Sequence, residues 1–294
     1  MNAFCHLVIS AMLMVSLAAS ASKPAMSLAA TDYLPADSVL IERLLAEAKA
    51  LPGGENRPLF FARKFLGRPY VAHTLEKNDD ERLVVNTREL DCTTLVETVS
   101  ALVLCDSRGQ RSFREYAAML KSLRYRQGVM DGYASRLHYF SDWIADKAAM
   151  RLVEDVQEPV PPFTAVKTLM VDYMSKHRGS YKALRLHPEL VADIARQEKA
   201  LSGRSFRYIP KSGLADASVS QAVKDGDIIA IVSNKGGLDI AHLGFAVWRA
   251  DGLHLLNASM IHRKVVEEPM TLGQYLQRHP SHLGIRIVRL ITQY

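Results

Sequence analysis

One cysteine in the sequence occupies a position that suits nucleophilic chemistry. Cys92 directly follows Asp91, at the start of a segment whose apolar residues repeat with helical spacing. A thiol in the first turn of a helix faces unpaired backbone N–H groups and the positive end of the helix dipole, and both favour the thiolate. Cys92 is therefore a candidate nucleophile, and its own N–H could donate to an oxyanion. The alternative is an inert thiol packed at a helix start, because free cysteine is among the most often buried residue types.

A cysteine nucleophile needs a base, and His242 is the best placed of the ten histidines. It begins the run His242–Trp248, whose alternation predicts a strand. On that strand the side chains of His242, Gly244 and Ala246 share one face, so small residues lie beside the histidine. A structural histidine at a strand start is the alternative.

Asn257 is a candidate to orient that histidine, because it lies on the next predicted strand. A loop centred between Arg249 and Ala250 would place Asn257 directly opposite His242, whereas a two-residue Asp-Gly turn would place it opposite Ala246. Both registers keep the two side chains on one face. The amide oxygen of an asparagine can accept from an imidazole N–H and fix its tautomer, as the third member of a catalytic triad does. A strand-end asparagine without a catalytic function is the alternative.

These residues need helices in the first part of the chain and strands in the last. Apolar spacing and capping residues predict helices at residues 37–51, 58–66, 91–104, 112–124, 141–149 and 187–201. Period-two runs predict strands at residues 82–86, 227–232, 241–248, 253–259 and 285–290. We expect an α+β fold with a single core, in which the later strands form an antiparallel meander.

The N-terminus has the layout of an export signal. The first 21 residues contain no Lys, Arg, Asp or Glu, and small residues follow the apolar run from Leu7 to Ala19. This pattern predicts a signal peptide over residues 1–21, a flexible lead over 22–36 and one domain over 37–294. We expect a periplasmic or secreted protein without stable membrane insertion after cleavage; an uncleaved anchor is the alternative.

Export would leave two cysteines, Cys92 and Cys105, in an oxidising compartment. A helix between them separates their Cα atoms by roughly 20 Å at the usual rise per residue. A disulfide requires Cα atoms within about 7 Å of each other. We therefore predict two free thiols, of which Cys105 is buried and inert.

Composition limits the classes of partner. The 294 residues are 48% hydrophobic and 23% charged, with a formal net charge of +6, which is typical of a globular protein. The positive charge suits an anionic partner such as a cell-wall polymer. No basic stripe interleaved with aromatics indicates nucleic acid. No phosphate-binding glycine loop or zinc motif is present, so we expect neither cofactor nor metal. The oligomeric state stays open.

Five segments together resemble the NlpC-type cysteine peptidase superfamily. They are Asp91-Cys92-Thr93, His242-Leu243-Gly244, Leu256-Asn257-Ala258-Ser259, Gly67-Arg68-Pro69-Tyr70 and Lys224-Asp225-Gly226-Asp227-Ile228-Ile229. The resemblance implies a papain-like core, in which a helix bearing the cysteine packs on an antiparallel sheet bearing the histidine, with extra helices here. It also implies that Tyr70 is an active-site tyrosine, and that Asn257 occupies a position where histidine is more common.

The segment Arg136–Trp143 resembles the N-acetylmuramoyl-L-alanine amidase-like branch. Members cleave the bond between the muramoyl lactyl group and L-alanine, and the resemblance implies small or anhydro-muropeptide fragments as substrates. In this segment the Trp143 face could stack on a sugar, Arg136 and His138 could donate to carboxylate or acetamido oxygens, and Tyr139 lies between them. The alternative is a helix start with Trp143 in the core.

The combined prediction is an exported amidase that works through a thioester on Cys92, with His242 and Asn257 as its partners. A γ-D-glutamyl-diamino acid endopeptidase of the same superfamily is one alternative. A non-catalytic module that binds muropeptides through the Arg136–Trp143 segment is the other.

Overall fold

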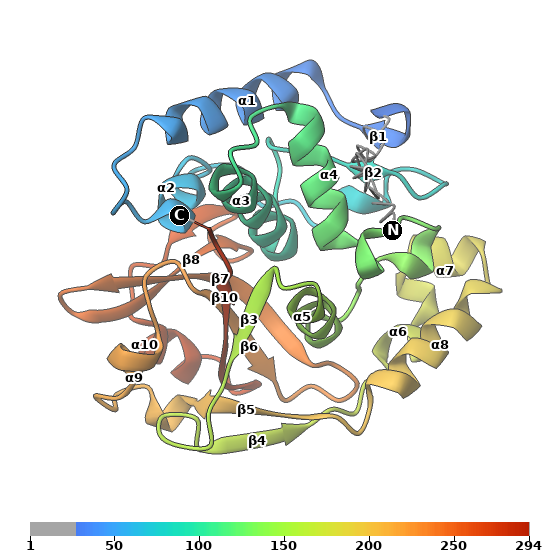
Figure 1. The fold of residues 1–294 in the computed structure, drawn as a ribbon. Coiled ribbons are helices and arrows are strands. Elements are labelled where there is room, and N and C mark those ends of the chain that lie inside the picture. Colours follow the sequence, from blue (N-terminus) through green and yellow to red (C-terminus); the bar gives the residue numbers. More distant parts are fainter. Residues whose placement is uncertain (1–27, 294) are drawn as a thin grey trace, which may run out of the picture.

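The computed structural model describes residues 28–293, and the predicted signal peptide lies outside the described residues (Figure 1). The α-helices are α1 (Pro35–Lys49), α2 (Arg57–Arg63), α3 (Cys92–Ser107), α4 (Phe113–Arg124), α5 (Phe140–Ala149), α6 (Tyr173–Lys176), α7 (Lys182–Leu186), α8 (Leu190–Leu201), α9 (Val219–Ala222) and α10 (Leu272–Gln277). The strands are β1 (Thr31–Asp32), β2 (Leu83–Val84), β3 (Val153–Val156), β4 (Ala165–Thr168), β5 (Ser205–Pro210), β6 (Ile228–Ser233), β7 (Ile240–Arg249), β8 (Gly252–Ser259), β9 (Lys264–Glu267) and β10 (His282–Leu290). Within residues 28–293, every helix is too short or too polar to cross a lipid bilayer.

An antiparallel sheet runs through the molecule in the strand order β4-β5-β10-β6-β7-β8-β9, and β3 also pairs with β10. The predicted meander is present in β6, β7 and β8 and continues into β9. The last strand departs from it, because β10 returns to the far side of β6 and pairs there. This crossover buries β6 on both edges, which suits its uninterrupted apolar sequence.

Helices cover both faces of the sheet, and this confirms the predicted α+β class. One core joins α1 to α5 with the face of β7 that carries Leu243, Phe245 and Val247. A second core joins α9 and α10 with the opposite face, which carries Ala246 and Leu255. The alternation predicted for β7 therefore decides which helices each of its side chains contacts.

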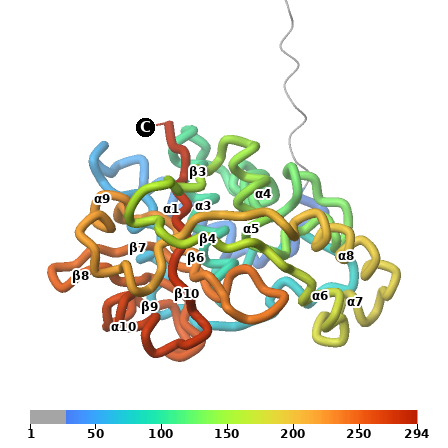
Figure 2. The backbone as a smooth tube through the Cα atoms, turned by 90° about the horizontal axis from the view of Figure 1, so that it is seen from below, coloured from blue at the N-terminus to red at the C-terminus, as the bar shows by residue number. Residues whose placement is uncertain are grey.

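A third hydrophobic cluster lies in a part of the chain for which few elements are predicted. Helices α6, α7 and α8 pack with residues of β5 and with Tyr133 and Tyr139. Figure 2 shows these helices at one end of the molecule, with β8 and α9 toward the other. The stretch between α5 and α8, for which no element is predicted, contains β3, β4, the short helices α6 and α7 and a 3₁₀ turn at Arg178–Ser180.

Part of the segment expected to be a flexible lead is folded. Thr31 and Asp32 form β1, which pairs in parallel with β2, and the Thr31 side chain is buried. Helix α1 begins at Pro35, earlier than predicted, because proline suits the first helical turn. The Asp37 carboxylate accepts a hydrogen bond of 2.9 Å from the backbone N–H of Leu34 and so caps this helix.

The start of α3 is fixed by reciprocal hydrogen bonds. The Asp91 carboxylate accepts from the Thr94 backbone N–H at 2.8 Å, and the Thr94 hydroxyl accepts from the Asp91 N–H at 2.9 Å. This capping box makes Cys92 the first residue of the helix, as predicted. Because α3 is buried along most of its length against β7 and β8, the first turn cannot shift relative to the sheet.

The β7–β8 hairpin has a register between the two that were predicted. Arg249 pairs with Gly252, so the turn is Ala250-Asp251, and neither the direct His242–Asn257 pairing nor the Asp-Gly turn is correct. Gly252 has a φ of 130°, a conformation that favours glycine and lets this residue begin β8 immediately after the turn. Because this register differs from each predicted one by an even number of residues, the side chains of His242 and Asn257 still lie on the same face of the sheet.

Gly244 is the point of closest approach between β7 and β8. A Cβ atom at this position would lie 2.6 Å from the Leu256 backbone oxygen and 2.8 Å from the Leu255 side chain. The space expected beside His242 is therefore filled by β8 itself, and a side chain here would separate the two strands that carry His242 and Asn257.

Gly244→Ala should lower the free energy of unfolding by about 1–3 kcal/mol, since overpacking forces backbone movement. Gly236→Ala is the matched control, because a Cβ there would meet nothing within 4 Å. Chemical denaturation of the two variants checks this; equal stabilities would contradict the close approach.

Candidate active site

The structure brings Cys92, His242 and Asn257 together at the junction of α3, β7 and β8. His242 Nε2 and Asn257 Oδ1 are 2.9 Å apart, and the Cys92 side chain is hydrogen-bonded to the same histidine. An amide oxygen only accepts, so Nε2 of His242 carries the proton and donates. The other ring nitrogen, Nδ1, is then the one available to the Cys92 thiol.

The start of β7 is irregular next to the histidine. His242 pairs with Ile231, whereas Ile240 pairs with Val232, so Ala241 is an extra residue in β7. Such a bulge re-aims the side chains beside it. His242 therefore leaves the regular part of the strand where the first turn of α3 approaches.

The surroundings of His242 favour its protonated form. Burial lowers the pKa of His242, but the negative charge of Cys92, the hydrogen bonds to Cys92 and Asn257 and the Glu268 carboxylate outweigh it. The net effect is a pKa above the usual value for histidine. The site therefore makes His242 a stronger base toward the neighbouring thiol than an ordinary histidine, which is what a cysteine nucleophile requires of its partner.

A cavity of about 190 Å³ opens beside Cys92 and His242. Two of the predicted substrate-binding residues, His138 and Tyr139, line it. The remaining lining residues are Thr93, Phe140, Met174, Tyr181, Leu238, Asp239, Ile240, Ala241 and Leu243. No lysine or arginine is among these described residues, so the cavity wall carries no fixed positive charge.

The polar groups in the cavity wall are buried or hydrogen-bonded. Burial, together with the charge of Arg136, lowers the pKa of His138 to about 3, so its ring is neutral at neutral pH. Burial raises the pKa of the Asp239 carboxyl above its usual value despite the hydrogen bond from the Ser141 N–H. The Tyr139 hydroxyl donates to the Glu198 carboxylate at 2.6 Å.

Tyr70 lies beside the start of α3, outside the cavity lining. Its backbone forms a parallel bridge with Leu90, immediately before Asp91 and Cys92. Burial, with the charges of Cys92 and Asp91, raises the pKa of the Tyr70 hydroxyl to about 12. The phenol is therefore neutral at neutral pH and is able to donate a hydrogen bond.

Arg136 and Trp143, predicted to contact substrate, are not among the described residues that line the cavity beside Cys92. The Arg136 guanidinium is buried, donates to Glu76 at 2.6 Å and lies over the Tyr133 ring. Trp143 is only 1% exposed and stacks on Phe140 at 4.8 Å. Trp143 thus follows the core alternative, because α5 turns this ring toward the sheet and α4.

The two cysteines differ as their environments dictate. Both are free; Cys92 is half-buried, whereas Cys105 is fully buried in the core. Burial raises the pKa of the Cys105 thiol to about 12. A thiol in that state is a poor nucleophile, so only Cys92 has both access and a basic partner.

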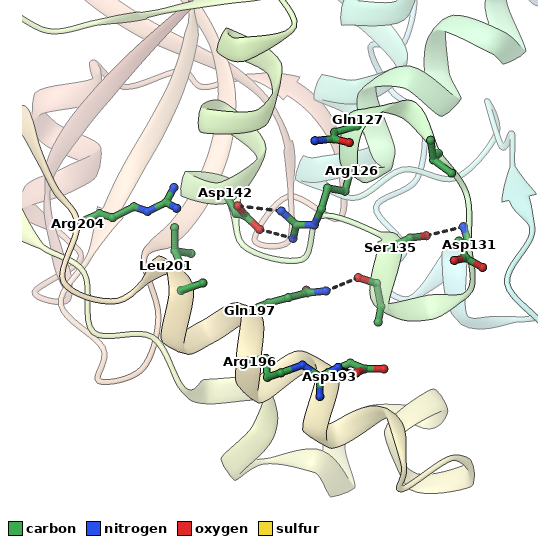
Figure 3. Close-up of a pocket in the computed structure, with 13 residues that line it drawn as sticks. Arg126, Gln127, Asp131, Ser135, Asp142, Asp193, Arg196, Gln197, Leu201 and Arg204 are labelled. Atoms are coloured by element: carbon green, nitrogen blue, oxygen red, sulfur yellow. Dashed lines mark hydrogen bonds and ion pairs between the residues drawn. The ribbon is translucent and has the colours of Figure 1, made fainter.

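A larger hollow of about 610 Å³ lies between α8 and the segment before α5 (Figure 3). Two of its three arginines are paired with carboxylates: Arg126 with Asp142 at 2.6 Å and Arg196 with Asp193. Within the described residues, neither a cysteine nor a histidine lines it. Its described lining therefore offers neither a thiol nor an imidazole base. In residues 28–293, no three His, Cys, Asp or Glu side chains are grouped to hold a metal ion.

Several site residues escape sequence reasoning. Met174 and Tyr181 reach the cavity from α6 and the turn before α7, and only the packing of this third cluster brings them there. Asp239 directly precedes β7, and that position close to His242 could have drawn attention to it. Glu268, which accepts from the Asn257 amide at 3.1 Å, carries no motif that would single it out.

Comparison with protein families supports a single assignment. The family model of AmiA-like, N-acetylmuramoyl-L-alanine amidase-like proteins matches residues 60–285. That range contains Cys92, His242 and Asn257 together with the cavity beside them. A search of curated proteins finds no match.

Solved structures resemble the chain over most of its length. An N-acetylmuramoyl-L-alanine amidase from Bacteroides uniformis is 42% identical, covers 80% of this chain and 97% of its own, and gives a TM-score of 0.75. A Bacteroides fragilis protein described as a candidate xylanase is 43% identical, covers 78% and 99%, and gives 0.73. A Legionella pneumophila protein at 22% identity, covering 86% and 94% with a TM-score of 0.68, shares the fold.

Iodoacetamide should alkylate Cys92 in the native protein and leave Cys105 unmodified until the protein is unfolded. The reason is access: Cys92 borders a cavity, whereas Cys105 is buried with a raised pKa. Peptide mass spectrometry after timed labelling measures both sites. Earlier labelling of Cys105 would contradict the placement of α3.

Proposed function

Because the chain belongs to the N-acetylmuramoyl-L-alanine amidase-like family, we propose that it is an exported cysteine amidase that hydrolyses the N-acetylmuramoyl-L-alanine bond of muropeptides. The observation that carries the proposal is the Cys92 thiol beside a histidine that Asn257 holds at 2.9 Å. The sequence and fold similarity to a Bacteroides uniformis amidase supports the same reaction. The packing of α3 on β7 and β8 supports an NlpC-type, papain-like core.

In the first step, Nδ1 of His242 takes the proton of the Cys92 thiol, and Sγ attacks the carbonyl carbon of the lactyl amide, forming a carbon–sulfur bond. The negative charge that develops on the carbonyl oxygen can be met by the Cys92 backbone N–H, which has no helical partner at this position, and by the Tyr70 hydroxyl. The His242 imidazolium then gives its proton to the alanine nitrogen as the carbon–nitrogen bond breaks. The peptide leaves and a thioester remains on Cys92.

In the second step, a water molecule hydrolyses the thioester. Neutral His242 accepts a proton from the water as its oxygen attacks the carbonyl carbon, and the carbon–sulfur bond breaks. The thiolate takes its proton back from the imidazolium, which restores the thiol, and the lactyl carboxylic acid leaves and gives its proton to the solvent. Asn257 holds the ring orientation through both proton transfers.

The cavity wall is suited to bind an uncharged group of the substrate next to the reacting carbonyl. Its neutral His138, its aromatic rings and the absence of lysine and arginine among its described residues suit the lactyl and acetamido region better than stem-peptide carboxylates. Its volume of about 190 Å³ suits one such group rather than a whole disaccharide. We therefore propose small muropeptide fragments as substrates.

Two other activities were weighed against this one. A γ-D-glutamyl-diamino acid endopeptidase would use the same three residues and differ only in which amide reaches Cys92. A xylanase-type glycosidase needs two carboxyl groups flanking the scissile bond. The described cavity lining contains only Asp239 as a carboxyl residue, and burial raises the pKa of its carboxyl.

Cys92→Ala should keep the fold and lose at least about 10³-fold in turnover, because no second thiol is among the described residues that line the cavity. Cys105→Ala is the matched control and should retain most activity. The substrate is a tetrapeptide-bearing anhydro-muropeptide, and mass spectrometry identifies the products.

We expect the wild type and Cys105→Ala to release free tetrapeptide and free sugar, and Cys92→Ala to release neither. Release of a sugar that retains L-Ala-D-Glu would move the cleavage site to the endopeptidase bond. Hydrolysis by Cys92→Ala would refute the nucleophile.

A further inference from the structure

A buried carboxylate lies behind the Asn257 side chain. Glu268 is 2% exposed, and its Oε1 accepts from Asn257 Nδ2 at 3.1 Å. Its other oxygen, Oε2, lies 3.1 Å from His262 Nε2, on a side chain that is 34% exposed. The contacts thus run in one line from Cys92 through His242, Asn257 and Glu268 to His262 at the surface.

The backbone holds this carboxylate in place. The Glu268 N–H donates to the Leu255 carbonyl at 2.8 Å, and the Glu268 carbonyl accepts from the buried His254 ring at 2.9 Å. Both partners lie on β8, the strand that carries Asn257. The distance between Glu268 and the Asn257 amide is therefore set by main-chain pairing rather than by a mobile loop.

The chemistry of the two groups leaves one orientation for the asparagine. A carboxylate can only accept hydrogen bonds, so the NH₂ group of Asn257 must face Glu268. The amide oxygen then has to face His242, which forces the ring proton onto Nε2 and leaves Nδ1 for Cys92. With no acceptor behind it, the Asn257 amide could turn over and present its NH₂ group to His242, which would place the proton on the nitrogen that must receive it from the thiol.

We propose that Glu268 is a positioning residue of the site: its carboxylate locks the Asn257 amide and thereby selects the His242 tautomer that serves Cys92. This inference rests on the proposed function of Cys92 as a nucleophile. It adds a fourth member, with its own charge, to the three residues that the sequence suggested.

Charged and titratable groups surround this line from every side. Cys92, on α3, contacts His242, and Asp91 and Tyr70 lie close to Cys92. His282, at the start of β10, and Asp239, in the cavity wall, lie on the sheet side. Tyr275 lies on α10, and the charges of Glu268 and Cys92 contribute to its raised pKa. Among these groups Glu268 is the negative charge in contact with the orienting amide, and it raises the pKa of His242.

Two substitutions separate orientation from charge. In Glu268→Gln the side-chain oxygen can still accept from Asn257, but the negative charge is gone. In Glu268→Leu both are removed. Glu97→Gln is the matched control, because Glu97 is equally buried, at 3% exposed, and accepts from Arg124 at 2.7 Å at a distance from the line.

The measurement is the pH dependence of Cys92 alkylation by iodoacetamide, with melting temperature recorded for every variant. Loss of the charge lowers the pKa of His242, so the base that must take the proton of the Cys92 thiol becomes weaker. We expect Glu268→Gln to alkylate roughly tenfold more slowly at pH 6 and Glu268→Leu more slowly still. Glu97→Gln should melt at a lower temperature with the wild-type pH profile.

A wild-type alkylation profile in folded Glu268→Gln and Glu268→Leu would overturn the proposal. If Glu268→Leu does not fold, the isosteric Glu268→Gln decides alone. The readout does not depend on any substrate. A protein whose Cys92 is reactive but which leaves muropeptides intact would refute the amidase assignment while still testing Glu268.

Discussion

The site depends on one contact between distant parts of the chain, the first turn of α3 against the irregular start of β7. The Asp91 capping box fixes where the helix begins, and burial of α3 against the sheet fixes its height. The bulge at Ala241 brings His242 out of the regular strand toward that turn. Neither element could move without separating the Cys92 thiol from His242, so packing rather than a flexible loop brings these two side chains together.

The electrostatics follow from the same packing. Burial alone would lower the pKa of His242, and the charge of Cys92, the hydrogen bond to Asn257 and the Glu268 carboxylate raise it. The adjoining cavity is different in kind, since its histidine is neutral and no described lysine or arginine lines it. The groups that raise the pKa of His242 thus lie at one edge of a recess whose own histidine is neutral.

Local sequence patterns predicted those parts of the fold that depend on near neighbours. The stripe after Asp91 gave the helix and its cap, and the alternation from His242 to Trp248 gave the strand and its two faces. An even-length loop between the two strands was enough to predict that His242 and Asn257 lie on the same face of the sheet. The register itself was missed, because the glycine that follows the Ala250-Asp251 turn tolerates a φ of 130° and permits more than one turn.

Features set by contacts between distant segments could not be predicted. Nothing in the sequence near Trp143 distinguishes a ring that stacks on sugar from one that stacks on Phe140 in the core. The return of β10 beside β6 and the arrival of Met174 at the cavity are consequences of the assembled sheet. Glu268 became visible only when its 3.1 Å contact with the Asn257 amide was known.

The most direct test of the central claim is to trap the covalent intermediate. The protein is mixed with a tetrapeptide-bearing anhydro-muropeptide, quenched in acid within the first turnover, and analysed by intact and peptide mass spectrometry. The account predicts an adduct on Cys92 with the mass of the muramoyl acyl group alone, without any amino acid. An adduct that includes L-Ala-D-Glu, or turnover with Cys92 unmodified throughout, would contradict it.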